Sequence, residues 1–355
     1  MLRRALLPAA IALVAAAGPA AGQVARVAFE PVLAVDAVAG SDVPRSAGVW
    51  IDLFGALRLA DGLDLVARPV VNRRTFDGEW QTQIYQLGLR YERPGRIGFR
   101  IEGGVMPSPI GLGMLENRPD INPVVSQHSA YYLPLPRADA ALPRTFLIAG
   151  TYPLGAQLTV SATRWDARVA VVDSSPARGR PFLDAGAQPR LANVVAGFGV
   201  TPRVGLRFGA AFAHGDYVAA GESGSWGANR AATLAQLEAE WSFRHTRLAG
   251  EWVRNVMETP WDDAVAQGGW IEITQTLTPR LFLASRGDAQ TYHYGDDYGP
   301  GPRLSEDYKR FEAVLGLRVT PDLTLRGGYM TRRGYVVSHW DDQVVVSIVW
   351  HRKVL

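Results

Sequence analysis

Isolated charged side chains, among glycine, threonine and serine, recur on one face of segments whose other face is apolar. In residues 309–319, Arg310, Glu312 and Arg318 lie opposite a face of phenylalanine, alanine, leucine and valine. This alternation indicates a β-strand with two unlike faces, because successive side chains of a strand point to opposite sides. Arginines and carboxylates that share one face can order water and select among small polar solutes in a narrow aqueous channel.

Residues with this pattern are expected to line an aqueous interior: Arg58, Arg68, Arg90, Arg100, Glu102, Arg207, Glu251, Arg286, Asp288, Arg318 and Arg326. The first four, here called the arginine ladder, come from four consecutive segments and lie near the same end of them. Their fields would add and give a weak preference for anions. The alternative is that charges on a wetted wall are solvated and neutralised by their neighbours.

Catalytic and metal chemistry have weaker support. None of the six histidines lies in a recognisable nucleophile motif, and Gly-x-Ser-x-Gly does not occur. Two acidic pairs, Asp296-Asp297 and Glu306-Asp307, carry the oxygen ligands that Ca²⁺ prefers, although solvated acids on a loop are the simpler interpretation. We therefore expect no enzyme activity, no metal and no cofactor. No concentrated basic run indicates a nucleic-acid partner.

The elements that must position these side chains are about sixteen alternating segments, each close to the length of a tilted strand that crosses a bilayer. The expected spans are 26–37, 49–59, 63–72, 82–92, 97–106, 144–152, 156–165, 190–200, 204–217, 232–243, 246–257, 268–278, 281–294, 308–319, 323–334 and 342–352. Short connections alternate with long polar ones, and Thr-Pro recurs in three short ones, where proline favours a tight turn. Aromatic residues near the segment ends are expected to face outward as interfacial girdles: Tyr85, Tyr91, Trp241, Phe243, Trp252 and Trp350.

This pattern predicts an all-β fold, a closed antiparallel transmembrane barrel with short periplasmic turns and long outer loops. A barrel of about sixteen strands is too wide for side chains to fill, so an aqueous channel remains. We therefore expect a passive porin that contacts outer-membrane lipid and passes small hydrophilic solutes. The main alternative is a structural or adhesive barrel whose outer loops bind partners, and a barrel enzyme is less favoured.

The N-terminal residues 1–22 have the pattern of a secretory signal peptide. Arg3 and Arg4 precede a short apolar stretch, and Ala20-Ala21-Gly22 offers small residues for cleavage before Gln23. Cleavage would lower the formal charge of +3 to about +1 and leave residues 23–355 as the barrel. The chain has no cysteine, so disulfides cannot stabilise it. We expect the outer membrane of a Gram-negative-type bacterium.

The longest connection, about 107–143, is the third of the long set and contains seven prolines. Long ordered loops are often functional. We expect it to fold into the barrel and narrow it, with these residues in the constriction: Glu116, Arg118, Asp120, His128, Tyr131, Tyr132 and Arg137. The alternative is a loop that caps the outer mouth or packs on a neighbouring subunit.

Residues 96–122, RIGFRIEGGVMPSPIGLGMLENRPDIN, resemble a segment of phosphate-selective porins of the O/P type. In that family a strand runs into a Pro-Phe-Gly-Leu-like turn that opens the third loop, and Pro109-Ile110-Gly111-Leu112 is similar to it. General-diffusion porins also place their third outer loop inside the barrel, and sixteen-strand porins imply a homotrimer. Two features depart from the phosphate-selective pattern: only Lys309 and Lys353 are lysines, and the C-terminus lacks a final aromatic residue.

Overall fold

The computed structural model describes most of the chain after residue 26. The described ranges are 27–40, 45–73, 79–115, 117–137, 140–150, 153–179, 192–223, 225–260, 262–294, 304–335 and 339–354. The expected signal peptide, residues 1–22, lies outside them. So do Glu116 and the acidic pair Asp296-Asp297.

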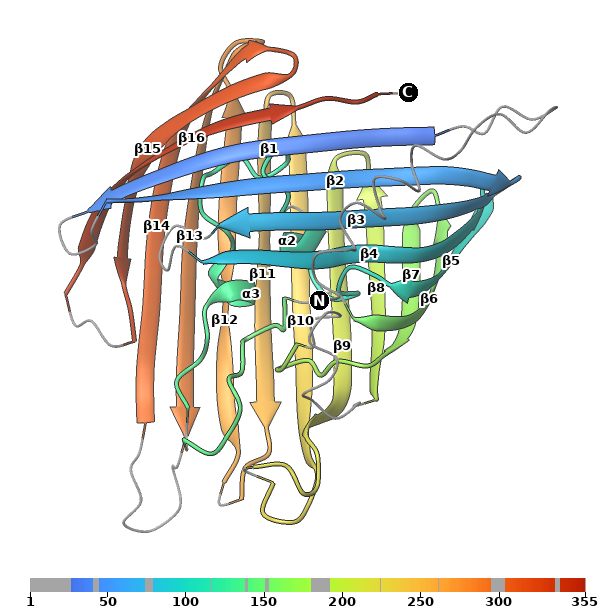
Figure 1. Ribbon diagram of the computed structural model, residues 1–355, viewed down its shortest axis with the longest axis vertical. Helices are drawn as coiled ribbons and strands as arrows, with labels where there is room; N and C mark the ends of the chain where they lie inside the picture. The colour runs from blue at the N-terminus through green and yellow to red at the C-terminus, as the bar shows by residue number, and fades with distance from the viewer. Residues whose placement is uncertain are drawn as a thin grey trace.

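Sixteen antiparallel strands close into one barrel, with each strand paired to its neighbours in sequence and β1 paired to β16 (Figure 1). The strands are β1 (Val27–Gly40), β2 (Ser46–Ala60), β3 (Leu63–Arg73), β4 (Trp80–Arg93), β5 (Ile97–Val105), β6 (Leu154–Ala162), β7 (Trp165–Val172), β8 (Asn193–Arg203), β9 (Leu206–Val218), β10 (Arg230–Phe243), β11 (Thr246–Met257), β12 (Ala264–Thr276), β13 (Leu281–Tyr294), β14 (Leu304–Thr320), β15 (Leu323–Arg333) and β16 (Asp341–His351). The predicted fold class and strand number are confirmed.

The two faces of the wall differ as the alternation predicts. On β16, Val344, Val346 and Ile348 are 59%, 47% and 52% exposed on the outside, whereas Val345 and Ser347 between them are buried. An apolar outer surface of this kind suits hydrocarbon, and closure leaves no strand edge with unpaired backbone groups. Among the described residues, no helix is long and apolar enough to cross a membrane.

One strand was misplaced by the sequence pattern. The expected strand at 144–152 is wrong. The total of sixteen strands is nevertheless right, because β7 is a strand in a segment that the sequence pattern had assigned to a loop. Residues 145–149 form one isolated bridge, at Phe146, and their backbone bonds go to Leu135, Ala130, Ala177 and Pro176 of other loop segments. Leu147 and Ile148 are fully buried inside the barrel, so their apolar run marks an inner core and not the membrane face.

A second departure concerns Tyr85. The register between β3 and β4 shifts between Arg68 and Pro69, so Tyr85 is an extra residue in its strand. A bulge turns its side chain inward, where it is 3% exposed and meets the ring of Trp50 edge-on at 5.9 Å. The other five predicted girdle residues are 37–53% exposed, as expected for the outer face.

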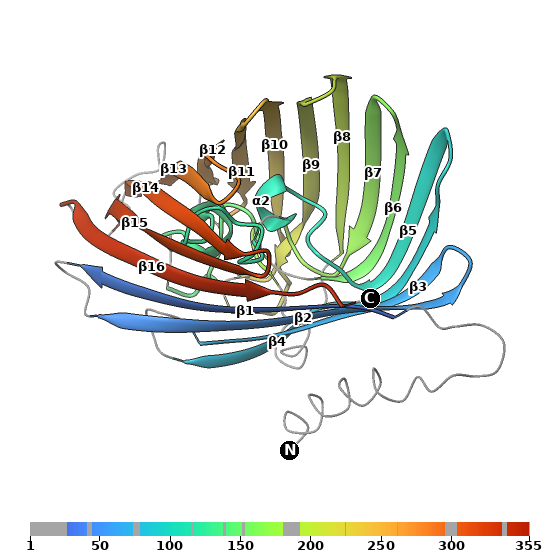
Figure 2. The ribbon, with the colours of Figure 1, turned by 90° about the horizontal axis from the view of Figure 1, so that it is seen from above.

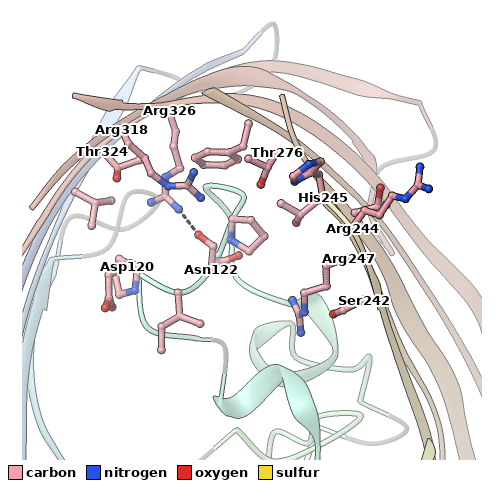
Figure 3. A pocket seen from close by; sticks show the side chains of 17 residues that line it. Asp120, Asn122, Ser242, Arg244, His245, Arg247, Thr276, Arg318, Thr324 and Arg326 are labelled. Atoms are coloured by element: carbon pink, nitrogen blue, oxygen red, sulfur yellow. Dashed lines mark hydrogen bonds between the residues drawn. The ribbon is translucent and has the colours of Figure 1, made fainter. Parts of the chain in front are cut away.

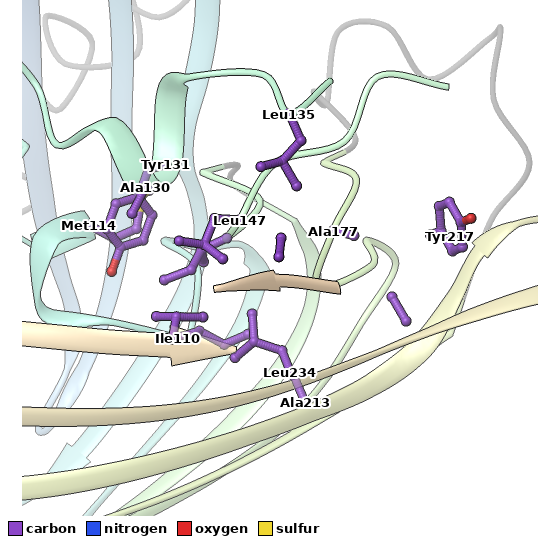
Figure 4. Close-up of a cluster of buried hydrophobic side chains, with 14 of the residues drawn as sticks. Ile110, Met114, Ala130, Tyr131, Leu135, Leu147, Ala177, Ala213, Tyr217 and Leu234 are labelled. Atoms are coloured by element: carbon purple, nitrogen blue, oxygen red, sulfur yellow. The ribbon is translucent and has the colours of Figure 1, made fainter. Parts of the chain in front are cut away.

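The third loop runs between β5 and β6, and is longer than the sequence pattern indicated. It contains two short helices, α2 (Leu112–Leu115) and α3 (Ser129–Tyr132), and lies within the ring of strands when the barrel is seen from above (Figure 2). Its apolar residues pack on inward side chains of the wall. Ile110, Met114, Tyr131 and Leu147 of the loop share one buried cluster with Leu234 of β10 (Figure 4).

Candidate functional site

Carboxylates on three different strands of the wall accept hydrogen bonds from backbone N–H groups of the third loop. Glu251 on β11 accepts the N–H of Gly113 at 2.9 Å, and Asp288 on β13 accepts that of Ser129 at 3.1 Å. Glu312 on β14 accepts the N–H of Val125 at 2.9 Å and of Ser126 at 3.2 Å. Carboxylates are strong acceptors for N–H groups, so the loop is anchored at three points along the wall.

The Glu251 anchor also binds two aromatic side chains. Its second carboxylate oxygen accepts the Tyr131 hydroxyl at 2.7 Å and the Trp270 indole N–H at 2.8 Å. The backbone of Gly111 has φ +91°, and a Cβ there would collide with the Tyr131 hydroxyl, so this turn requires glycine. Burial, followed by the neighbouring carboxylate, raises the pKa of Tyr131 well above its ordinary value and keeps the hydroxyl a donor.

Wall arginines bind the opposite backbone groups, the loop carbonyls. Arg310 donates to the carbonyl of Gln127 at 2.6 Å, and Arg286 donates to that of Ser126. Arg326 donates to the carbonyl of Asn122 and, at 2.7 Å, to that of Val124. Acceptors and donors of the wall are therefore matched to the donors and acceptors of loop residues 122–129.

His128 occupies the centre of this contact. Arg286 Nη1 lies 3.0 Å from His128 Nε2, and because arginine can only donate, Nε2 must be the unprotonated nitrogen. The ring is fully buried and its centroid is 4.4 Å from that of Trp270. Burial first, and then the charges of Arg286 and Arg310, lower the pKa of His128 well below its ordinary value.

The arginine ladder faces inward, but each member has a carboxylate partner. Arg58 pairs with Asp64, and Arg90 Nη2 lies 3.9 Å from the same carboxylate. Arg68 Nη2 lies 2.7 Å from the buried Asp52, and Arg100 Nη2 lies 3.2 Å from Glu92. These pairs match the alternative interpretation of the sequence, in which wall charges offset their neighbours.

The remaining predicted lining residues divide into two groups. Arg207 pairs with Asp166 and Glu238 on the neighbouring wall, and Glu102 lies 3.5 Å from the amide of Gln157. Arg318 has a different environment, because its guanidinium donates to the carbonyl of Pro279 and lies over the ring of Phe282.

The predicted loop residues also differ in whether they contact the wall or other residues of the loop. His128 and Tyr131 contact the wall through Arg286 and Glu251 as described, whereas Tyr132 bonds to Asn117 within the loop. Arg118 forms a two-pronged pair with Asp120 and reaches Glu30 of β1 at 3.3 Å. Arg137 donates to the carbonyl of Ala140 and is exposed.

Three wall residues were not predicted from the sequence as loop contacts: Trp270, Arg310 and Glu312. Alternation placed Arg310 and Glu312 on the inward face, and the same parity places Trp270 there. Their loop partners could not be read from the sequence, because they lie more than a hundred residues away in the chain. Within the described ranges, no group of three or more histidines, cysteines or carboxylates is arranged to hold a metal ion.

A cavity of about 380 Å³ lies between the loop tip, residues 119–123, and the short turns at the end of β10, β12 and β14 (Figure 3). Its charged lining consists of Arg244, Arg247, Arg318, Arg326 and Asp120. Arg318 and Arg326 lie side by side in Figure 3, and Asn122 faces Arg326 from the loop.

The sequence matches no protein-family model, and it matches no curated protein. Solved structures with the same fold include OmpT, an outer membrane protein of Vibrio cholerae, at 8% identity and a TM-score of 0.61, covering 94% of this chain and 100% of that one. An anion-selective porin from Comamonas acidovorans has 10% identity and a TM-score of 0.60, covering 93% of this chain and 100% of that one.

The outer membrane channel DcaP of Acinetobacter baumannii has 11% identity and a TM-score of 0.57, covering 95% of this chain and 100% of that one. At such identities these likenesses establish a porin-like barrel fold. The similarity of residues 96–122 to phosphate-selective porins stays a local sequence resemblance.

Proposed function

We propose that this chain is a passive porin of the outer membrane of a Gram-negative-type bacterium, and that it passes small hydrophilic solutes. The observation that carries the proposal is the contrast between the two faces of one closed wall. The outside is apolar, and the inside carries paired arginines and carboxylates from β2 to β14. Charged side chains are costly on a lipid face but are solvated in a water-filled lumen.

The third loop is proposed to set the size limit. It occupies part of the lumen through the apolar cluster around Tyr131 and Leu147, and the carboxylate anchors hold it there. Solutes would pass between this loop and the ladder side of the wall, and the predicted lining and loop residues would contact them. Weak anion preference is expected, because the ladder charges are offset by carboxylates.

Assembly as a homotrimer is part of the proposal. A structure of Vibrio cholerae OmpT with the same fold, at 8% identity and a TM-score of 0.60, is described as a trimer form. Analytical ultracentrifugation in detergent should give the mass of three chains if this chain assembles likewise.

Planar-bilayer recording tests the proposed function. The purified protein should give stable open steps, and a salt gradient should give a small reversal potential of anion-preferring sign. Vesicles containing the protein should swell with small sugars. Correctly folded protein that gives neither open steps nor swelling would contradict the porin proposal and favour a structural or adhesive barrel.

A further inference from the structure

The cavity beneath the loop tip has an unusual charge balance. The ladder arginines and Arg207, Arg286 and Arg310 all have a carboxylate within 4.0 Å. Arg318 and Arg326 have none among the described residues, although both face the cavity. The acid in the lining, Asp120, is already held by Arg118. Asp36, Glu312 and Asp120 act on Arg326 from beyond that distance, so Arg318 is the cavity arginine whose charge is least offset.

Arg318 is the arginine with donors to spare. One guanidinium nitrogen donates to the Pro279 carbonyl at 3.3 Å, and no other hydrogen bond from the guanidinium is found among the described residues. Arg326 already donates to Asn122, Val124 and Ser347 through its two terminal nitrogens, so fewer of its donors remain for a ligand than those of Arg318. A guanidinium fork with free N–H groups matches the two oxygens of a carboxylate.

Strand pairing fixes these two arginines next to each other. Arg326 on β15 is opposite Gly316 on β14, and Arg318 is the next inward position of β14. Gly316 is required here, because a Cβ would collide with the ring of Phe282 from β13. The ring in turn supports Arg318, whose guanidinium carbon lies 5.0 Å from its centroid. Arg318 is thus held at the cavity by an aromatic platform.

Part of the cavity lining is apolar. Ile121 at the loop tip is 51% exposed, although it faces the lumen and not the lipid. Pro119 and Pro123 flank it, and Phe282 and Val349 line the cavity from the wall. Water contact of an apolar side chain is unfavourable, and a ligand with an apolar body would remove it. Threonine hydroxyls at 246, 274, 276 and 324 add hydrogen-bonding groups to the lining.

We propose that this cavity is a binding site for small organic carboxylates that have an apolar body. The carboxylate would bind Arg318 in the field of Arg326, and the apolar body would cover Ile121. The volume of about 380 Å³ falls in the range of small-molecule sites. The inference rests on the proposed function in one respect, since the ligand must enter through the lumen.

Titration calorimetry of the folded protein in detergent at pH 7.5 tests the site with benzoate as the probe. Benzoate should bind, whereas benzamide, which lacks the charge, and inorganic phosphate, which lacks the apolar body, should each bind at least about tenfold more weakly. Arg318→Gln should weaken benzoate binding at least about tenfold, and Ile121→Ser about fivefold. Arg96→Gln makes the same charge change in an exposed short turn and should leave benzoate binding unchanged.

Phosphate binding as tight as benzoate would overturn the proposal, because charge alone would then suffice. Unchanged benzoate affinity in Arg318→Gln would overturn it as well, provided the variant keeps the heat-dependent gel mobility of a folded barrel. Calorimetry does not require conduction. If the protein binds benzoate but gives no open steps in a bilayer, the porin proposal is contradicted and the proposed binding site is supported. If it gives open steps but does not bind benzoate, the binding site is contradicted and the porin proposal is supported.

Discussion

Removal of the Glu312 carboxylate should release the third loop from the wall. Glu312 is fully buried and accepts the N–H groups of Val125 and Ser126 together with the Ser126 hydroxyl. Glu312→Ala would leave two partly buried N–H groups without an acceptor, at a cost of about 1–3 kcal/mol each. A total of about 4 kcal/mol changes the ratio of seated to released loop by roughly a thousandfold.

Glu312→Gln is the graded comparison. The amide oxygen of the glutamine can take the position of Glu312 Oε1 and still accept the two N–H groups. The variant then loses only the negative charge and the second acceptor oxygen. This loss costs about 1–2 kcal/mol, which changes the ratio of seated to released loop roughly tenfold. The third loop should therefore be released most often in Glu312→Ala, less often in Glu312→Gln and least often in the parent protein. Glu92→Ala is the matched control, because Glu92 pairs with the exposed Arg100 and exposed pairs contribute about 1 kcal/mol or less.

Single-channel recording reads the release directly. Deletion of about residues 112–140 gives the conductance of a barrel without the loop core, and it should exceed that of the parent. Glu312→Ala should visit this high-conductance level often, Glu312→Gln less often, and Glu92→Ala as rarely as the parent. If Glu312→Ala inserts normally and its conductance and noise equal those of the parent, while the deletion conducts more, the carboxylate anchor does not hold the loop.

Three further predictions concern selectivity, pH and export. Replacing all four ladder arginines by glutamine should shift the reversal potential toward cations, most at low salt where screening is least; an unchanged value would show that ladder charges do not act on the conducting path. Because the pKa of His128 is lowered in the seated loop, a released loop binds more protons below pH 6.5, so seating should be constant above about pH 7 and lose about 1.4 kcal/mol per pH unit below 6.5. High-conductance events should thus increase toward pH 5.5, and His128→Gln should remove this increase; an unchanged increase in that variant would show that His128 is not the titrating group. Mature protein should begin near Gln23, fractionate with outer membrane and migrate faster unheated than boiled; recovery as a soluble periplasmic protein would contradict the barrel in its proposed setting.

The sequence alone determined the wall. A strand has a period of two and each face meets one solvent, so alternation reports which residues face inward, as it did for Arg310, Glu312 and Arg318. Closure follows from the same pattern, since every strand edge in lipid must be paired. The turns followed from local chemistry, because proline and short connections restrict the backbone within a few residues.

The tertiary structure alone decided the partners. The buried run around Leu147 and Ile148 has the composition of a strand, and only its packing in the lumen distinguishes it from one. Tyr85 faces inward because of a bulge that depends on the pairing of two strands. Most importantly, Glu312 meets Ser126 and Arg286 meets His128 across more than a hundred residues. Such contacts depend on how a long loop returns to the wall, and neither periodicity nor turn chemistry encodes that path.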